Sequence, residues 1–246
     1  ACFLAHGVET EKSRAVLIAA RQEFRRNYEA VTFGNIGMNI IGKESRSDTI
    51  AVLKSIDTAW NDVDPLLQNI LENPSDPVAL HAVRSNSAPL FASTDKLVSQ
   101  IAGQYSNPAE LIQRDAILIN LAGRQGNLTQ EIANHACEIW EQESSTLAKD
   151  ALVSSMQAFE ATLHALRHGL PELGLRPAPT EEIAKGLDSV LADWSKTRSL
   201  LDKMIGTASF PETSRAEFYT HMTQTSQKLE LLVKSYILQA KLHQNR

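Results

Sequence analysis

The chain has 246 residues, a formal net charge of −5 and an apolar content of 43%, so it carries enough apolar residues to bury a core and is not intrinsically disordered. No run approaches the roughly 18 uninterrupted apolar residues that a transmembrane helix needs. The negative charge argues against a nucleic-acid partner, because nucleic acid is bound by a basic face. With 11 glycines and 9 prolines, the composition favours helix over strand.

Helix-breaking residues divide the chain into eight predicted helical segments. They run from a helix end at 1–6 through 9–33, 45–72 and 78–103 to 108–143, 146–168, 180–205 and 212–243. No segment alternates with period two over enough residues to form a strand. We therefore predict an all-α fold.

The ends of these helices carry the expected signals. Glycines that suit the position just after a helix are Gly7, Gly34, Gly103, Gly169 and Gly206. Asn107-Pro108-Ala109-Glu110 has a capping Asn, a Pro at the first helical position and an early acid. Thr180-Glu181-Glu182 places a capping residue before two acids in the first turn.

The chain contains an internal repeat. A shift of 135 places Cys2 on Cys137, Gln22 on Gln157, Phe24 on Phe159 and Gly34 on Gly169, and a shift of 134 places Trp60 on Trp194. Two amphipathic bundles can resemble each other because Leu and Ala fill both, but matching Trp and Cys positions favour a true duplication. We predict two tandem up-down four-helix bundles, 1–105 and 106–246, the first of which lacks most of its first helix.

The predicted helix 108–143 carries two stripes at 100° per residue. The predicted core stripe is Leu111, Leu118, Leu121, Leu128, Ile132, Ala136 and Ile139. The second stripe is Ile112, Ala116, Ile119, Gly123, Gly126, Gln130 and Cys137. A second stripe with two glycines suggests that another backbone approaches there; a kink or tolerated surface glycines are the alternative.

The segment Ile119–Gln130 resembles the first-helix signature of the PilJ/NarX-like family. Residues Asn120, Ala122, Gly123, Thr129 and Gln130 match it, and the helix with Trp194, Leu200 and Leu201 resembles the family's third helix. These are the N-terminal sensory domains of type IV pili methyl-accepting chemotaxis transducers and of nitrate/nitrite sensor kinases. The resemblance implies a periplasmic or extracellular four-helix bundle that senses a ligand without catalysis.

The resemblance also implies a small-anion ligand held between two copies of this helix by a signature Arg. In this chain Gly126 stands at the Arg position and Asn127 at the following Met, so the guanidinium that would hold a planar anion is absent. Arg124 points about 160° away from Gly126. The candidate ligand-binding residues are Asn120, Gly123, Arg124, Gly126 and Gln130.

Cys2 and Cys137 are the two cysteines and are equivalent in the repeat. If both copies of the first helix run side by side, the chain forms a pseudo-twofold dimer within itself, and these cysteines approach each other near its axis. A disulfide is then possible, and an exported protein could keep it. Two separate, buried cysteines that act as small hydrophobes are the alternative.

Two further patterns are compatible with chemistry. Glu160, His164 and His168 share a helix face and could hold zinc or copper, but no further ligand is identifiable, so we expect a solvated face and no metal. Arg14, Arg21, Arg25 and Arg26 form a positive face on one helix, which is either solvated or binds a phosphate or carboxylate.

No nucleophile elbow, phosphate-binding Gly loop, dinucleotide fingerprint or zinc-protease helix is present, so we expect neither an enzyme nor a cofactor. The start Ala1-Cys2-Phe3 has no initiator Met, which fits a processed end of an exported protein. We predict a sensory module that binds a small molecule or anion and signals through a membrane protein. A helical adaptor that binds a partner helix is the alternative.

Overall fold

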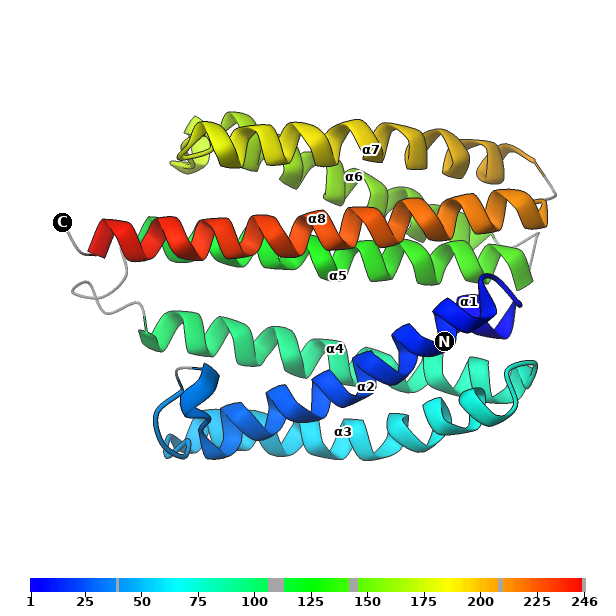
Figure 1. The fold of residues 1–246 in the computed structure, drawn as a ribbon, viewed down its shortest axis with the longest axis horizontal. Coiled ribbons are helices and arrows are strands. Elements are labelled where there is room, and N and C mark those ends of the chain that lie inside the picture. The colour runs from blue at the N-terminus through cyan, green and yellow to red at the C-terminus, as the bar shows by residue number, and fades with distance from the viewer. Residues whose placement is uncertain (39, 106–112, 142–145, 208–209, 245–246) are drawn as a thin grey trace. The chain divides into compact units, whose positions relative to one another are not determined.

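The computed structural model describes the chain except residues 39, 106–112, 142–145, 208–209 and 245–246. It divides into two compact units, Ala1–Gln104 (unit 1) and Tyr105–Arg246 (unit 2). Helices joined by short connections make up both units, and the described residues include no β-strand (Figure 1). The prediction of an all-α fold built from helical bundles is confirmed.

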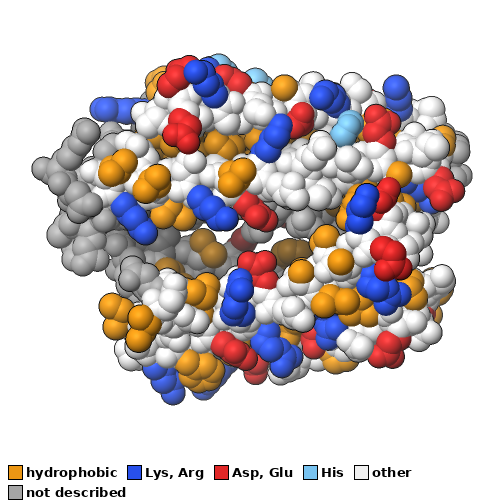
Figure 2. All heavy atoms as spheres, in the orientation of Figure 1, with side chains coloured by type: hydrophobic (Ala, Val, Ile, Leu, Met, Phe, Trp, Pro, Cys, Tyr) orange, Lys and Arg blue, Asp and Glu red, His pale blue; other side chains and the backbone are white. Residues whose placement is uncertain are grey.

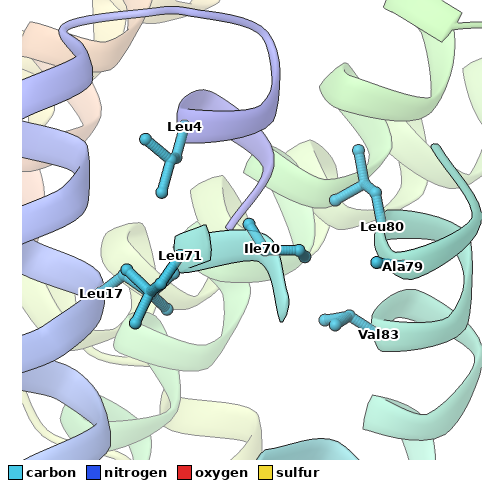
Figure 3. Close-up of a cluster of buried hydrophobic side chains, with 7 residues drawn as sticks. All are labelled: Leu4, Leu17, Ile70, Leu71, Ala79, Leu80 and Val83. Atoms are coloured by element: carbon cyan, nitrogen blue, oxygen red, sulfur yellow. The ribbon is translucent and has the colours of Figure 1, made fainter. Parts of the chain in front are cut away.

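Unit 1 contains one helical remnant and three long helices. Its elements are α1 (Cys2–Ala5), α2 (Thr10–Phe33), the short 3₁₀ turn η1 (Ile36–Met38), α3 (Ser47–Glu72) and α4 (Pro77–Tyr105). Buried side chains from all four helices meet at one end of the unit: Leu4, Leu17, Ile70, Leu71, Ala79, Leu80 and Val83 (Figure 3). Beyond Val83, the residues of α4 whose side chains are described are half-buried or exposed.

Unit 2 is a complete four-helix bundle. Its elements are α5 (Gln113–Glu141), α6 (Thr146–His168), η2 (Pro171–Leu173), α7 (Glu181–Gly206) and α8 (Glu212–Gln244). Helix α5 packs on α6 and α8, and α7 packs on the same two helices, which closes a ring of four neighbours. Apolar side chains from every helix fill its interior, with Ile132, Leu152, Val190 and Phe218 fully buried.

The loops after α2 and α6 repeat the same geometry 135 residues apart. Each loop leaves its helix at a glycine with positive φ, makes a 3₁₀ turn and closes with one antiparallel bridge. The bridges join Asn35 to Ile40 and Leu170 to Leu175. Because the turn, the bridge and the glycine all keep the sequence offset, the structure supports the duplication inferred from Trp and Cys positions.

The predicted helix ends agree with the structure at Thr180 but not at Gly103. The Thr180 hydroxyl accepts a hydrogen bond from the Ile183 backbone N–H at 3.2 Å and caps α7. Gly103 and Gly206 were expected to follow helices, but α4 continues to Tyr105 and α7 includes Gly206 as its last residue. The predicted start at Asn107, Pro108 and Glu110 lies outside the described residues.

A carboxylate in the loop before α3 accepts four hydrogen bonds. Glu44 accepts hydrogen bonds from the Arg46 guanidinium at 2.6 and 3.0 Å and from the Ser45 and Arg46 backbone N–H groups at 2.8 and 2.9 Å. The Arg46 side chain, helped by these backbone donors, lowers the pKa of Glu44 from 4.5 to about 2.

We expect Glu44→Gln to make the unfolding free energy of unit 1 less dependent on pH under acidic conditions. A carboxylate with a lowered folded pKa stabilises the fold above its unfolded pKa near 4.5, and this contribution is lost as pH falls toward 2. Urea unfolding between pH 5 and pH 2, in roughly half-unit steps, measures the change. Glu29→Gln, at an exposed position of α2, is the matched control and should leave the slope unchanged.

Candidate functional site

The five predicted ligand-binding residues lie along the outward side of α5. Gly123, Arg124 and Gln130 are exposed, whereas Asn120 and Gly126 are half-buried. Their placement leaves the polar groups of Asn120, Arg124 and Gln130 outside the interior of the unit 2 bundle. Any ligand they hold would therefore bind on the surface of α5.

The buried side of α5 differs from the predicted core stripe. Leu121 and Leu128 are half-buried, whereas Ala122, Gln125 and Thr129 are fully or almost fully buried. The buried positions 118, 122, 125, 129, 132 and 136 alternate spacings of four and three, as in helices that pack nearly parallel. The stripe prediction is confirmed at Leu118, Ile132, Ala136 and Ile139, which are buried. It was wrong at Leu121 and Leu128, because the interior positions between them include the polar residues Gln125 and Thr129, which hydrophobicity does not select.

Two polar side chains missed by the sequence analysis therefore lie in the bundle interior. The Thr129 hydroxyl donates a hydrogen bond to the Gly126 carbonyl at 2.6 Å. Both polar atoms of the Gln125 amide are buried without a hydrogen-bond partner in the part of the chain that the structure describes. The regular four-and-three spacing along α5 is the signal that could have identified both.

Gly123 and Gly126 do not contact another backbone in the described part of the chain. A Cβ atom built on either glycine has no atom within 4 Å, apart from its own chain neighbours and its own helix backbone. Within unit 2, open space therefore lies beside both glycines, and the approach of another backbone to the second stripe stays a prediction.

We expect Gly123→Ala to raise the unfolding free energy by about 0.5–1 kcal/mol, because alanine is the better helix former and the space is open. Urea denaturation checks this value. Gly186→Ala in α7 is the control: its Cβ would lie 2.7 Å from the Leu232 Cδ2 atom, so the gain in helix propensity is reduced or lost. A destabilised Gly123→Ala variant would indicate that another chain segment packs there after all.

The two cysteines are equivalent in the repeat, where α1 corresponds to the last residues of α5. Cys2 begins α1, and Cys137 is fully buried near the end of α5. Neither of them, both within the described residues, is a free thiol. The alternative of two separate, unpaired cysteines was therefore wrong.

The three residues considered as metal ligands make other contacts in the structure. The rings of His164 and His168 stack with centroids 5.9 Å apart, and Glu160 turns toward α7. Among the described residues, no group of three or more His, Cys, Asp or Glu side chains has a geometry that could hold a metal ion.

Glu160 belongs to a compact polar contact between α6 and α7. Its Oε1 atom accepts hydrogen bonds from the Trp194 indole Nε1 at 2.8 Å and from the Arg198 guanidinium at 2.6 Å. The Trp194 ring also packs on Phe159, with centroids 4.5 Å apart. Hydrogen bonds to Glu160 and Asp202 raise the pKa of Arg198, which keeps this side chain charged.

The equivalent contact between α2 and α3 in unit 1 has a different charge pattern. Phe24 stacks on Trp60 with centroids 4.0 Å apart. Arg21 donates to Asp64 at 2.7 Å and to the Gln68 side chain at 2.5 Å, and Arg25 lies 3.6 Å from Asp64. The positive face predicted on this helix is therefore directed in part at α3.

The remaining members of that positive face have separate partners. Arg14 donates to the Leu71 carbonyl, and Arg26 pairs with the exposed Glu23 at 3.5 Å. On the faces visible in Figure 2, Lys and Arg side chains are interspersed with Asp and Glu, so neither sign of charge forms a continuous field there.

Every helix in the described part of the chain is too short or too polar to cross a lipid bilayer. Residues 111–217 match the model of the PilJ family, described as the N-terminal region of type IV pili methyl-accepting chemotaxis transducers. The match runs from the start of α5 through α6 and α7 into α8. Comparisons with curated proteins and with solved structures gave no match.

Proposed function

We propose, from the premise that residues 111–217 carry the sensory domain of the PilJ family, that this chain is an exported, non-enzymatic sensory module of two PilJ-like bundles. In this proposal unit 2 is the complete bundle and unit 1 is its shortened duplicate. The ligand is a small anion on the outward side of α5, and the signal passes to a membrane signalling protein.

The observation that carries this proposal is the PilJ match over residues 111–217, which covers most of unit 2 and includes α5. The similar loops after α2 and α6 support treating unit 1 as a second bundle of the same kind. On α5, Asn120, Arg124 and Gln130 supply hydrogen-bond donors on a half-buried or exposed face. Ligand binding would act by favouring one of two arrangements of the helices, which requires different affinities for the two.

Thermal unfolding in sodium nitrate, compared with sodium chloride at equal ionic strength, tests the ligand. A ligand that binds only the folded state raises the midpoint, and the rise grows with the logarithm of its concentration once that exceeds the dissociation constant. We expect Asn120→Ala and Gln130→Ala to reduce a nitrate-specific rise in the midpoint.

Restoring the missing guanidinium is the sharper test of the α5 surface. Gly126→Arg should strengthen the nitrate effect, because open space surrounds Gly126 and Arg holds planar anions with paired hydrogen bonds. Gly123→Arg adds the same charge at another open position and should not strengthen it. The absence of any nitrate-specific shift in both the natural protein and Gly126→Arg would overturn the anion-sensing proposal.

A helical adaptor is the second candidate function, favoured by exposed leucines on α8. Leu231, Leu238 and Leu242 are 63%, 61% and 51% exposed and follow one another on one side of this helix. Leu231→Lys with Leu238→Lys should abolish co-purification of a helical partner if this function holds. Retained co-purification, or a nitrate response that depends on α5, would argue for the sensory function instead.

We further propose that Cys2 and Cys137 form one disulfide near a pseudo-twofold axis that relates the two first helices. Equivalent positions in the repeat, and the absence of a free thiol at either, support this pairing. Mass spectrometry of a non-reduced digest should find the Cys2 peptide linked to the Cys137 peptide. A Cys2–Cys2 link between two chains, or two free thiols in oxidised protein, would contradict it.

A further inference from the structure

The α2–α3 and α6–α7 contacts are equivalent in the repeat but opposite in charge. The aromatic pairs correspond, Phe24 with Phe159 and Trp60 with Trp194. The ionic residues are exchanged at the same positions: α2 carries Arg25 where α6 carries Glu160, and α3 carries Asp64 where α7 carries Arg198.

In unit 2 this exchange leaves every group satisfied. The Glu160 carboxylate accepts from both the buried Trp194 indole and the Arg198 guanidinium, at 2.8 and 2.6 Å. A buried indole N–H needs such an acceptor, because an unpaired buried donor bears the full cost of its desolvation.

In unit 1 the indole has lost its acceptor. Trp60 is 9% exposed, and its buried Nε1 atom has no hydrogen-bond partner in the described part of the chain. The position that supplies the carboxylate in unit 2 holds Arg25, which is itself a donor. The contact therefore presents an indole N–H and a guanidinium on the side where unit 2 has a carboxylate.

The contact between α2 and α3 also has fewer negative than positive groups. Asp64 is paired closely with Arg21 at 2.7 Å, and Arg25 reaches it only at 3.6 Å. One carboxylate thus faces two guanidinium groups. The Arg25 side chain is 63% exposed and only this long contact at 3.6 Å holds it to Asp64, so it can change rotamer at little cost to meet a ligand.

We propose that unit 1 binds a small free carboxylate at this contact, where the ligand takes the place that the Glu160 carboxylate holds in unit 2. The ligand accepts hydrogen bonds from the Trp60 Nε1 atom and from Arg25. This site is separate from the α5 surface and does not depend on it.

A monocarboxylate fits these donors better than a phosphate. Two donors converge on the carboxylate oxygen in unit 2, and the same number is available in unit 1. A dianion would bring a second negative charge close to Asp64, whose own partner is already Arg21. Sodium acetate is therefore the appropriate probe.

The indole N–H resonances of ¹⁵N-labelled protein provide a direct test. The chain has three Trp residues, and Trp60→Phe identifies the Trp60 resonance by its loss. We expect acetate, titrated against sodium chloride at equal ionic strength, to shift the Trp60 resonance saturably. The other two act as internal controls, because Trp194 is bonded to Glu160 and Trp140 contacts the Met204 sulfur at 3.0 Å.

Variants at position 25 separate this site from a general salt effect. Arg25→Glu supplies the carboxylate within the chain, so it should shift the Trp60 resonance without acetate and abolish the titration. Arg25→Met removes one charged donor and should raise the half-saturating acetate concentration roughly tenfold or more. Arg26→Glu makes the same charge change at an exposed neighbouring position and should leave the titration intact.

Several outcomes would overturn the proposal. They are a Trp60 resonance that acetate does not move, three indole resonances that move together, and an unchanged titration in Arg25→Met. A failure here with an intact nitrate response of α5 would refute this site alone.

Discussion

Phe159→Ala is expected to lower the unfolding free energy of unit 2 by about 3–5 kcal/mol, the usual cost of removing a buried phenyl ring from a close-packed core. Phe159 is fully buried and packs on Trp194. The complete ring of α5, α6, α7 and α8 limits how far the surrounding side chains can collapse into the cavity.

The repeat supplies a matched control at Phe24. This ring also packs on a Trp, Trp60, but it is half-buried where Phe159 is fully buried. Phe24→Ala should therefore cost only about 1–2 kcal/mol, in line with its smaller buried area. Urea unfolding followed by tryptophan fluorescence measures both changes. Equal costs would show that unit 1 is as tightly packed around Phe24 as unit 2 is around Phe159.

The sequence was sufficient to predict where the helices lie and that they repeat, because both are visible in local residue patterns. Glycines, prolines and capping residues mark where helices end, and α7 begins after Thr180 as predicted. The shift of 135 residues is carried by rare residue types, and the structure repeats the loop geometry at that offset. Gly103 and Gly206 are exceptions, because each lies within the helix that it was predicted to follow.

The interior of α5 could not be predicted in the same way. Hydrophobicity selected Leu121 and Leu128, but the helix directs Gln125 and Thr129 into the bundle, because the positions that face α6 and α8 are set by the packing of all four helices. The glycines of α5 were equally ambiguous, since a sequence does not distinguish close packing from open space beside Gly123.

The two copies of the repeat together show a feature of the ionic contacts that neither copy shows alone. Arg25 alone is one of several exposed arginines, and Asp64 alone is an ordinary acid. The alignment of the two copies pairs these residues with Glu160 and Arg198 and shows that the charges are exchanged. Only the structure reveals that the exchange leaves the Trp60 N–H without a partner among the described residues, because hydrogen bonding depends on side-chain geometry.

Gly34→Ala is expected to destabilise unit 1 by about 2–3 kcal/mol or more, because two costs add at this position. Gly34 has φ 87° and ψ 153°, a backbone conformation that is essentially restricted to glycine. A Cβ atom there would also lie 2.6 Å from the Gly42 carbonyl oxygen, where the loop folds back on the end of α2. Since the obstructing atoms are backbone, relief requires the loop itself to move.

Two other glycines separate these costs. Gly7 has φ 70° but no atom within 4 Å of its Cβ position, so Gly7→Ala should show the conformational cost alone, about 1–2 kcal/mol. Gly169 is the repeat counterpart of Gly34, with φ 81° and a Cβ position 2.8 Å from the Leu175 carbonyl oxygen, so Gly169→Ala should destabilise unit 2 as severely. We expect urea unfolding to show that the Gly7→Ala variant loses less stability than the Gly34→Ala and Gly169→Ala variants. Equal losses at Gly7 and Gly34 would mean that the loop after α2 yields freely and does not hold the helix end.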